Sequence, residues 1–375
     1  MATVGFDARY INDRYHGIGR HAYGLLEALT RLDSSSEFVV YVNPSYSNTR
    51  FDLGVIGGRR NVRLKPATWP LYSVMEQLRW PATLVHDQVS IFHSPYVTVP
   101  VLAPARLLLT IHDLIFERFP QYMPRRAYRT LYRAQLRMAI QRASAVLTVS
   151  QATAIELANH YPAAAKVSVI GNAVSPTFVP VRDSQRLLSA RARYELAEPF
   201  VLAVGMSRPH KNFATLVDAF ARVVSRIHTP HQLVLAGGVD ERFVDSVGAR
   251  VAEHGLSGRI RRIWATEDDL PALYSLAEVL VVPSIIEGFG LPALEAMSCG
   301  TPVLASKIPA VLEVTGDAAL TFDPLDRVEL AELLERTLRD AALRSDLSER
   351  GLARARTFTW ERVARRVLGV YSAIR

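Results

Sequence analysis

The stretch from Pro283 to Val303 reads PSIIEGFGLPALEAMSCGTPV and decides the fold class. The residues just before it, AEVLVV, form a short β-branched apolar run typical of a parallel strand covered on both faces. Behind the turn, Pro292 suits the first turn of a helix and Gly300 suits the position just past its end. This order of strand, turn and helix places Glu287 at the carboxyl edge of a parallel sheet, where open α/β sheets bind ligands.

The same alternation of strand and helix signals continues through the rest of the chain. Strands are expected at TVGFDA, EFVVYVN, RLLLTIHD, AVLTVS and KVSVIGN in the first half, and at FVLAVG, HQLVLAGG, RIRRIW, VLVVPS, TPVLAS and AALTFD in the second. A connector without clear period, residues 175–199, separates the two series. We therefore predict an α/β protein of two doubly wound domains that face each other across a cleft.

Composition is that of an ordinary globular protein. The 375 residues are 49% hydrophobic and 21% charged, which is enough for two domains with separate cores. A single cysteine cannot form an internal disulfide, which favours a reducing, cytoplasmic setting. No apolar run approaches the roughly 20 residues that span a bilayer, and the start MATVGFDARYI lacks the features of a signal peptide. We expect a protein that is soluble or at most peripheral.

The net positive charge of the chain comes entirely from its first half. Residues 1–180 hold 19 Lys and Arg against 11 Asp and Glu, whereas the remaining residues hold 25 of each kind. A one-sided basic surface attracts anions such as phospholipid headgroups or nucleic acid. No nucleic-acid recognition motif accompanies this charge, so nucleic acid is not an expected partner.

Two basic residues follow the first strand of the second series. That strand ends in MSRPHKN, and FATLVDAFARVV has the apolar spacing of a helix. Arg208 and Lys211 therefore lie on a loop entering a helix, where free backbone N–H groups and the helix dipole favour an anion. Two fixed cations there suit a diphosphate. The alternative is a pair of solvated surface charges, and this pair alone does not decide between the two.

Glu287 and Glu295 supply hydrogen-bond acceptors, which the two cations of a diphosphate site cannot provide. Carboxylates are acceptors that can hold the paired hydroxyls of a sugar or ribose. Gly288 and Gly290 let the backbone approach a ligand closely, and the amides of Phe289–Leu291 can donate to its oxygens. An ordinary surface loop and amphipathic helix is the alternative. It is weakened by the apolar and small neighbours of Glu295, which indicate partial burial, and an unpaired buried carboxylate is costly.

The stretch SIIEGFGLPALEAMSCGTPVLAS resembles the signature of the retaining family 4 glycosyltransferases, and VGMSRPHKN resembles that family's phosphate-binding segment. GIGRHAYGLLEAL, FHSPY, LLLTIHDLIFERFPQYMP and AVLTVSQAT are similar to a branch containing bacterial mannosyltransferases that build surface polysaccharides. The likeness runs from Gly5 to about Trp360. It implies the GT-B fold, with Rossmann-like domains at residues 1–175 on the acceptor side and 176–358 on the nucleotide-sugar side. A last helix, residues 359–375, would return to the first domain.

The resemblance implies a role for each matching residue. Arg208 and Lys211 would neutralise the donor's diphosphate. Glu295 would hold the ribose hydroxyls, and Glu287 would face the transferred sugar. The remaining donor contacts would come from the backbone of Phe289, Gly290, Leu291, Gly17 and Gly19. The expected catalytic group is His112 together with Arg208, Lys211 and Glu287.

His112 ends the run RLLLTI, so it is expected at the carboxyl edge of a strand, where the family has a histidine beside the donor sugar. The alternative is a histidine that bonds a local backbone group or caps a turn with Asp113. In the functional interpretation, Asp113 orients His112 or binds acceptor hydroxyls. His16 could also reach the cleft.

The family implies metal-independent transfer with retention, in which preorganised charges stabilise the leaving diphosphate. No metal and no cofactor are expected, because the close acidic run TEDDL is better explained as first-turn acids of a helix. No enzymic nucleophile stands out, which favours front-face attack by the acceptor. The branch favours GDP-mannose as donor and a glycan or lipid-linked acceptor, with other GDP-, UDP- or dTDP-sugars as alternatives.

Arginines recur every fourth residue within YMPRRAYRTLYRAQLRMAIQR, at Arg125, Arg129, Arg133 and Arg137. On a helix they form one slowly winding stripe. A solvated helix face is the alternative to a functional stripe. Because relatives often glycosylate lipid-linked acceptors at the inner membrane surface, we expect the stripe to bind anionic lipid, with the protein cytoplasmic and peripheral there.

Other function classes stay open. A phosphorylase or a nucleotide-sugar epimerase can share the two-domain fold. A non-catalytic partner subunit of the same fold is a further alternative. Such a subunit should have lost catalytic groups, whereas Arg208, Lys211, Glu287 and Glu295 are all present here.

Overall fold

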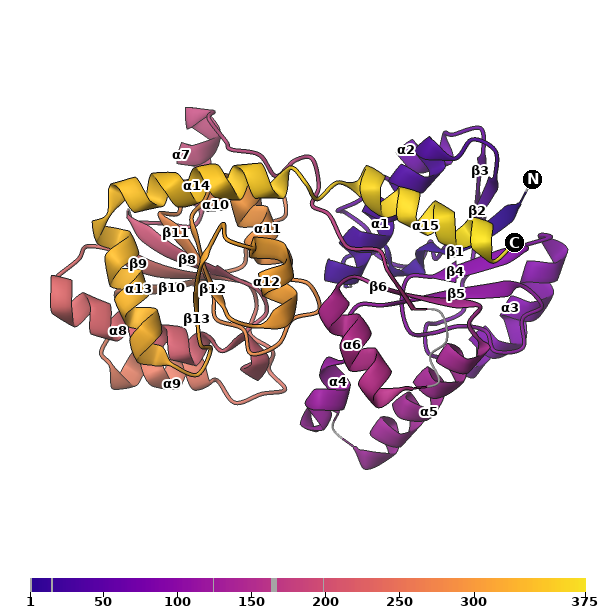
Figure 1. Cartoon of the computed structure of the whole chain (residues 1–375), viewed down its shortest axis with the longest axis horizontal. Coiled ribbons are helices and arrows are strands. Elements are labelled where there is room, and N and C mark those ends of the chain that lie inside the picture. Colours follow the sequence, from indigo (N-terminus) through magenta and orange to yellow (C-terminus); the bar gives the residue numbers. More distant parts are fainter. Residues whose placement is uncertain (1, 15, 124, 163–166, 198) are drawn as a thin grey trace. The chain divides into compact units, whose positions relative to one another are not determined.

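The computed structural model describes residues 2–14, 16–123, 125–162, 167–197 and 199–375. The chain forms two compact units (Figure 1). The N-terminal unit combines Met1–Ala173 with Thr359–Arg375, and the C-terminal unit is the continuous segment Val174–Phe358. Each unit is a parallel sheet covered by helices, which is the α/β class that the alternating sequence pattern predicts.

The N-terminal sheet has the strand order β3-β2-β1-β4-β5-β6-β7, and its neighbouring strands pair in parallel. The direction in which strands are added therefore reverses between β1 and β4. The strands are β1 (Thr3–Asp7), β2 (Glu37–Val42), β3 (Val62–Pro66), β4 (Ile91–Ser94), β5 (Arg106–Ile111), β6 (Ala145–Thr148) and β7 (Val167–Val169). The helices are α1 (His16–Leu32), α2 (Leu53–Gly57), α3 (Val74–His86), α4 (Ile115–Arg118), α5 (Arg126–Arg142), α6 (Gln151–His160) and α15 (Trp360–Ala373), with short 3₁₀ turns η1 (Ala8–Tyr10) and η2 (Pro120–Tyr122).

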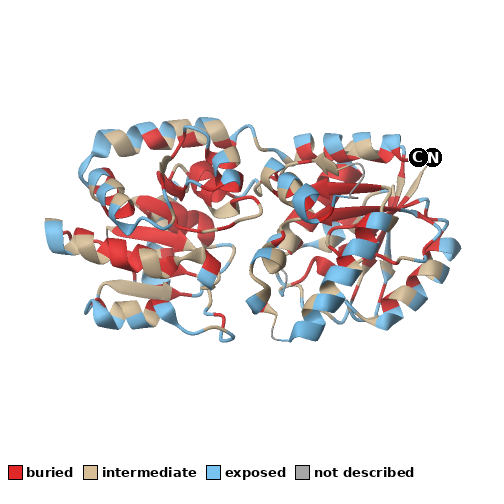
Figure 2. Cartoon of the chain, turned by 60° about the horizontal axis from the view of Figure 1, so that its bottom comes forward, coloured by how far each residue is buried: buried red, intermediate tan, exposed pale blue. Residues whose placement is uncertain are grey.

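The inner strands of this sheet are buried on both faces, which explains their nearly continuous apolar sequences. In β2, Phe38 and Val40 pack into one core with α1 and α15, whereas Val39 and Tyr41 pack into the other with α3 and α5. Successive side chains of a strand point to opposite faces, so both faces need apolar residues. Figure 2 shows the result in each unit, with buried strands inside and helices exposed on their outer faces.

The last helix, α15, belongs to the N-terminal unit. Val363, Val367 and Tyr371 recur at helical spacing and are buried in the same core as α1. At the start of α15 the indole of Trp360 lies against Gly24 of α1, where a Cβ would come within 2.2 Å of the Trp360 ring. A side chain at residue 24 would therefore push the two helices apart.

The C-terminal sheet has the order β10-β9-β8-β11-β12-β13, again with parallel pairing, and the direction of strand addition reverses between β8 and β11. Its strands are β8 (Phe200–Val204), β9 (Gln232–Ala236), β10 (Ile260–Ile263), β11 (Val279–Val282), β12 (Val303–Ser306) and β13 (Leu320–Phe322). The helices are α7 (Ser184–Arg193), α8 (Phe213–Ile227), α9 (Ser246–Glu253), α10 (Leu270–Leu276), α11 (Leu291–Ser298), α12 (Pro309–Thr315), α13 (Arg327–Arg339) and α14 (Ala341–Ala355), with the 3₁₀ turn η3 (Pro209–Lys211).

Three elements differ from the sequence interpretation. Strand β3 was missed because its sequence VRLKP is charged and largely exposed, and β4 because it spans four residues that include polar His93 and Ser94. Helix α7 lies inside the segment that we interpreted as a connector. Its only buried residue among those described is Ala190, so it lacks an apolar stripe, and the Asp183 side chain caps its start.

Candidate active site

The candidate site lies where the C-terminal sheet reverses direction. Strands β8 and β11 pair with each other, although β9 and β10 come between them in sequence. Their following loops, residues 205–212 and 283–290, leave the carboxyl edge side by side and are joined by a hydrogen bond from Ile285 N to His210 O at 2.8 Å. The carboxyl edge at such a reversal is the usual ligand site of a doubly wound sheet.

Lys211 and Glu287 come from the two loops and form an ion pair. Lys211 Nζ donates to Glu287 Oε1 at 2.7 Å, and Ser284 Oγ donates to the same oxygen at 2.6 Å. Burial alone would raise the pKa of Glu287, but the charge and hydrogen bond of Lys211, with the Ser284 hydroxyl, lower it below its ordinary value. The carboxylate is therefore ionised, and its Oε2 has no hydrogen bond from the described residues. This oxygen can accept one from a sugar hydroxyl.

Arg208 is held at the start of η3 by an acid that follows the neighbouring strand β9. Its Nε donates to Asp240 Oδ2 at 2.9 Å, and Arg242 also binds both oxygens of that carboxylate. The Arg242 hydrogen bonds, opposed by burial and assisted by Arg208, hold the pKa of Asp240 far below its ordinary value. A charged Asp240 fixes the direction of the Arg208 side chain, which stays 37% exposed and can meet an anion with its terminal nitrogens.

The turn between β11 and α11 is built on Gly290. This residue caps α11 with φ +107°, a conformation that side chains other than glycine rarely adopt. The Phe289 ring is buried against Phe358, with ring centroids 6.0 Å apart, so only the backbone of the turn is available to a ligand. Leu291 begins α11 and Gly300 follows it with φ +78°, as the sequence predicts.

Glu295 lies inside α11 and is buried, as expected from its neighbours. Its carboxylate is already hydrogen-bonded, because Tyr274 of α10 donates to Oε2 at 2.7 Å. The cost of burying an unpaired carboxylate therefore does not by itself require a ligand here. The charge of Glu295, together with burial as the larger cause, raises the pKa of the Cys299 thiol to about 12, which keeps that thiol protonated.

Three supporting residues were missed at the sequence level: Ser284, Asp240 and Tyr274. Ser284 and Asp240 follow the ends of β11 and β9, so a search for every polar residue just past a predicted strand would have found both. Tyr274 carries no such signal. Its hydrogen bond to Glu295 depends on how α10 packs beside α11.

In the N-terminal unit His112 follows β5 directly. Its Nε2 donates to the Pro95 carbonyl at 2.8 Å, and burial lowers the pKa of the ring to about 4 despite that bond. The neutral ring therefore carries its proton on Nε2, and Nδ1 remains an acceptor. Asp113 Oδ1 accepts from Ile115 N at 3.0 Å. The local backbone interactions named as the alternative are thus both formed, and they leave Nδ1 of His112 for a ligand.

Gly17 and Gly19 of HGIGR follow the first strand and belong to the helix after it. Gly17 and Gly19 lie in the first turn of α1, separated from β1 by η1 and further residues. A Cβ at Gly19 would come within 3.1 Å of the Tyr10 carbonyl, so this glycine lets α1 pack on η1. Gly17 is exposed at the helix start, where its amide can still face an anion. The side chain of His16 lies outside the described residues.

The buried histidines predict acid sensitivity. Burial lowers the pKa of His93 to about 3 and the pKa values of His112 and His210 to about 4. Groups with depressed pKa values stabilise the fold above their unfolded pKa of about 6.5, and this stability is lost as the pH falls. We expect the free energy of unfolding to fall between pH 6.5 and pH 4 by about 1.4 kcal/mol per pH unit for each histidine. Denaturant titrations at several pH values measure this slope. His93→Gln should reduce this slope by about 1.4 kcal/mol per pH unit, the contribution of one histidine. A free energy of unfolding that does not change over this pH range would contradict the burial of neutral histidines.

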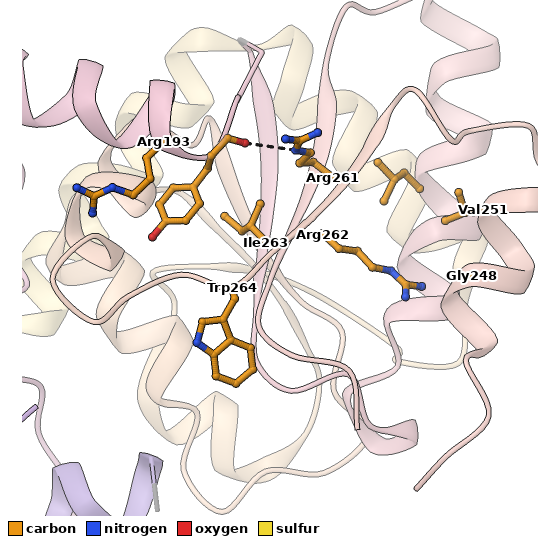
Figure 3. Close-up of a pocket in the computed structure, with 9 residues that line it drawn as sticks. Arg193, Gly248, Val251, Arg261, Arg262, Ile263 and Trp264 are labelled. Carbon is orange, nitrogen blue, oxygen red and sulfur yellow. Dashed lines mark hydrogen bonds between the residues drawn. The ribbon is translucent and has the colours of Figure 1, made fainter. Parts of the chain in front are cut away.

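A separate pocket of about 470 Å³ lies along the edge strand β10 and includes Trp264 (Figure 3). Its three guanidinium groups each pair with a carboxylate, in the pairs Arg193–Asp269, Arg261–Glu195 and Arg262–Asp245. The pocket lies along an edge strand, whereas ligands of a doubly wound sheet bind at the carboxyl edge where the strand order reverses, here between β8 and β11. We therefore place the candidate site at that edge.

Comparison with known proteins identifies the family. Residues 15–178 match the family model described as Glycosyltransferase Family 4, and residues 188–354 match Glycosyl transferases group 1. The chain is 30% identical to O-antigen chain mannosyltransferase B of Escherichia coli over 373 residues, covering 96% of each protein. The chain belongs to glycosyltransferase family 4. This glycosyltransferase is also 32% identical over 281 residues to the serotype-specific mannosyltransferase WbdA of Escherichia coli, covering 72% of the chain and 34% of WbdA.

The fold of this glycosyltransferase is GT-B. The solved structure of sucrose-phosphate synthase from Thermosynechococcus elongatus superposes with a TM-score of 0.77 at 22% identity, covering 100% of the chain and 99% of that structure. Among the described residues of the glycosyltransferase, no helix is long and apolar enough to cross a membrane. The same residues contain no group of three or more His, Cys, Asp or Glu side chains placed to hold a metal ion.

Proposed function

We propose that this glycosyltransferase moves mannose from GDP-mannose to a saccharide or a lipid-linked saccharide. The Lys211–Glu287 ion pair between the two loops is the observation that carries this proposal. It places a fixed cation and a fixed acceptor side by side at the carboxyl edge of the sheet, and a sugar diphosphate needs both. Mannose is supported by the names of the two curated relatives. The motif resemblance of the sequence favours GDP as the nucleotide.

In this proposal each unit has a separate task. In the C-terminal unit, Arg208 and Lys211 neutralise the donor diphosphate and Glu295 holds the ribose. Glu287 faces the mannosyl group, and the backbone of Phe289, Gly290 and Leu291 donates to donor oxygens. The N-terminal unit receives the acceptor, with Asp113 binding its hydroxyls or orienting His112, which acts as a catalytic group beside the donor sugar. The amides of Gly17 and Gly19 contribute to the donor site from the start of α1.

We further propose transfer with retention and without a metal ion. As the bond between the sugar and the phosphate oxygen breaks, that oxygen gains negative charge, which Arg208 and Lys211 stabilise. The acceptor hydroxyl attacks the same face of the sugar and gives its proton to the departing phosphate oxygen. The negative charges of the leaving diphosphate are then neutralised by Arg208 and Lys211.

A donor panel tests the nucleotide and the sugar. A donor at about 100 times its dissociation constant adds about 2.7 kcal/mol of apparent stability, which a thermal-shift assay detects. We expect GDP-mannose to give the largest shift, and α-linked mannosides to receive mannose with an α-anomeric NMR signal in the product. Transfer should persist in EDTA. A larger shift with a UDP-sugar, or loss of transfer in EDTA with rescue by manganese, contradicts the proposal.

We also propose that α5 approaches anionic lipid at the inner membrane face. The structure modifies the arginine stripe: Arg133 pairs with Glu117 at 2.8 Å, and the Nε of Arg129 is buried. Arg125 and Arg137 are exposed, and the same helix carries exposed apolar side chains such as Leu131. A basic and apolar surface of this kind suits anionic headgroups, where each basic residue contributes about 1 kcal/mol.

Vesicle cosedimentation tests the α5 proposal. We expect binding to anionic vesicles at low salt, release at high salt and no binding to zwitterionic vesicles. Arg125→Glu with Arg137→Glu should weaken binding at least tenfold, because two attractive charges become repulsive. The control is Arg182→Glu with Arg356→Glu, which reverses two exposed arginines of the C-terminal unit. Equal binding by both double variants assigns the effect to net charge alone and contradicts a role for α5.

A further inference from the structure

Two tyrosine rings stand at the carboxyl edge of the N-terminal sheet, outside the residues assigned so far. Tyr72 precedes α3 and is 47% exposed, and Tyr96 follows β4 and is half-buried. Their ring centroids are 6.4 Å apart at an interplanar angle of 88°. Tyr96 also stacks on His112, with centroids 6.4 Å apart at 29°. The rings therefore continue the edge at which His112 lies.

The position of these rings coincides with the direction reversal of the N-terminal sheet. Tyr96 follows β4, and η1, which follows β1, lies directly beneath it, because the Tyr10 and Tyr96 centroids are 5.6 Å apart. Strands β1 and β4 are the neighbours between which the strand order reverses. Ligands bind in the crevice at this point of a doubly wound sheet. Tyr96 therefore lies at the point of the N-terminal sheet that corresponds to the reversal between β8 and β11 in the C-terminal sheet.

A buried charged network holds the segment that carries Tyr72. Arg9 binds both oxygens of Asp7 at 2.8 and 2.7 Å, and Arg9 Nη2 donates to Glu76 Oε1 at 2.5 Å. The guanidinium also lies over the ring of Trp80, 4.9 Å from its centroid. Asp7, Arg9 and Glu76 are all buried. An arginine between two carboxylates and an aromatic face fixes α3 to the end of β1.

Tyr72 is the residue that this network positions. The second oxygen of Glu76, Oε2, accepts from Tyr72 N at 2.6 Å. Tyr72 has φ +62°, a left-handed conformation that is uncommon for a residue with a side chain. Glycine would adopt this backbone conformation with less strain, so the local backbone does not itself require the Tyr72 ring.

We infer that Tyr72 and Tyr96 form a binding surface for one pyranose ring of the acceptor saccharide. The axial C–H groups of a pyranose make an apolar face that packs on an aromatic ring, and tyrosine adds a hydroxyl that can bond the sugar's rim. His112 Nδ1 is an acceptor at the same edge. This assignment rests on the proposed function, since it takes the acceptor to be a saccharide. In it, Glu76 is a positioning residue that acts through Tyr72.

Ring-removing and ring-keeping variants of the full chain test the inference. Tyr72→Gly removes the ring and suits the positive φ, so it should fold at least as well as the parent. With methyl α-mannoside or α-linked mannobiose as acceptor, Tyr72→Gly and Tyr96→Leu should raise the acceptor KM about three- to tenfold. Tyr72→Phe should stay near the parent value. Donor affinity, measured by calorimetry with the nucleoside diphosphate, should not change. Tyr128→Ala is the control, because it removes an exposed tyrosine on α5.

The role of Glu76 is tested by a double variant. Glu76→Gln weakens the hold on the Tyr72 backbone and should raise the acceptor KM with little change in kcat. In the Tyr72→Gly background the same change should add nothing, because there is no ring left to position. Equal effects of Glu76→Gln in both backgrounds would mean a general structural role and overturn this part.

Saturation-transfer NMR with the same mannosides separates this inference from the proposed function, since it needs no turnover. We expect transfer from protein to sugar C–H protons in the parent and in Tyr128→Ala, and its loss in Tyr72→Gly. If the parent transfers mannose but Tyr72→Gly keeps the parent KM and NMR signals, the surface is wrong and the proposed function stands. If no donor is turned over but sugar binding depends on Tyr72, the proposed function fails and the surface stands. Binding of neither mannoside to the parent overturns the surface.

Discussion

Lys211→Ala is expected to lower turnover on the order of 10²-fold or more, because it removes the charge that stabilises the leaving diphosphate. Lys211 and Glu287 are 2.7 Å apart and mostly buried, so the change also leaves Glu287 without its cation. Some loss of folding stability follows, but the loss of turnover should be far larger. Steady-state kinetics with saturating donor and acceptor, together with thermal unfolding of the same samples, measures both quantities. Arg208→Ala should behave in the same way, with a smaller effect on folding because that side chain is more exposed.

Lys307→Ala is the matched control for Lys211→Ala. Lys307 also belongs to the C-terminal unit and also pairs with a glutamate, Glu329, at 2.8 Å, but this pair lies on the surface after β12. Removing it should leave turnover within about twofold, because an exposed ion pair contributes little. Parent-like turnover in both Lys211→Ala and Arg208→Ala would remove the diphosphate assignment.

The second large effect separates the two glutamates. Glu295→Gln is expected to weaken nucleotide binding about tenfold or more, because a charged acceptor for the ribose hydroxyls is lost. Glu287→Gln should leave the affinity for the free nucleoside diphosphate unchanged and lower the rate of sugar transfer strongly. Calorimetry with the nucleoside diphosphate and kinetics with the intact donor give the two numbers for each variant.

Tyr274→Phe refines this separation. It removes the hydrogen bond to Glu295 Oε2 but keeps the carboxylate and the ring. Nucleotide affinity should fall in the same direction as in Glu295→Gln, by a smaller factor, because Glu295 remains charged but loses its orientation. Sugar transfer at saturating donor should be nearly unchanged. Equal losses of nucleotide affinity in Glu287→Gln and Glu295→Gln would contradict the division of roles.

Much of the fold could be predicted because both sheets are parallel and doubly covered. Buried strands such as β2 and β11 must be apolar on both faces, and this leaves continuous runs such as FVVYV and VLVV. Strand β3 was not predicted because most of its side chains are exposed, and its charged sequence carries no burial signal. Helix α7 escaped for the same reason, since a helix with one buried residue has no apolar stripe.

The position of the candidate site in the fold could be predicted from the order of strands and helices, but the contacts within the site could not. The order of strand, turn and helix places Lys211 and Glu287 at the carboxyl edge, and their loops are neighbours there. The partners of each charge were not predictable, because Lys211 and Glu287 are 76 residues apart and Arg208 and Asp240 are 32 apart. The place of Gly17 in the first turn of α1 was not predictable, because its sequence HGIGR fits both a tight turn and the start of a helix.

The route of the chain through the two units has a consequence for synthesis. The C-terminal unit is one continuous segment, so all of its strands and helices have left the ribosome once residue 358 has emerged. The N-terminal unit still lacks Val363, Val367 and Tyr371, which fill its core beside α1. Domains usually complete folding in the order in which they are translated. In this protein the order is reversed, because the C-terminal unit is complete before the N-terminal unit. The apolar groove on α1 therefore stays uncovered until α15 has been synthesised. A chain that stops before Thr359 should expose this groove to chaperones and proteases.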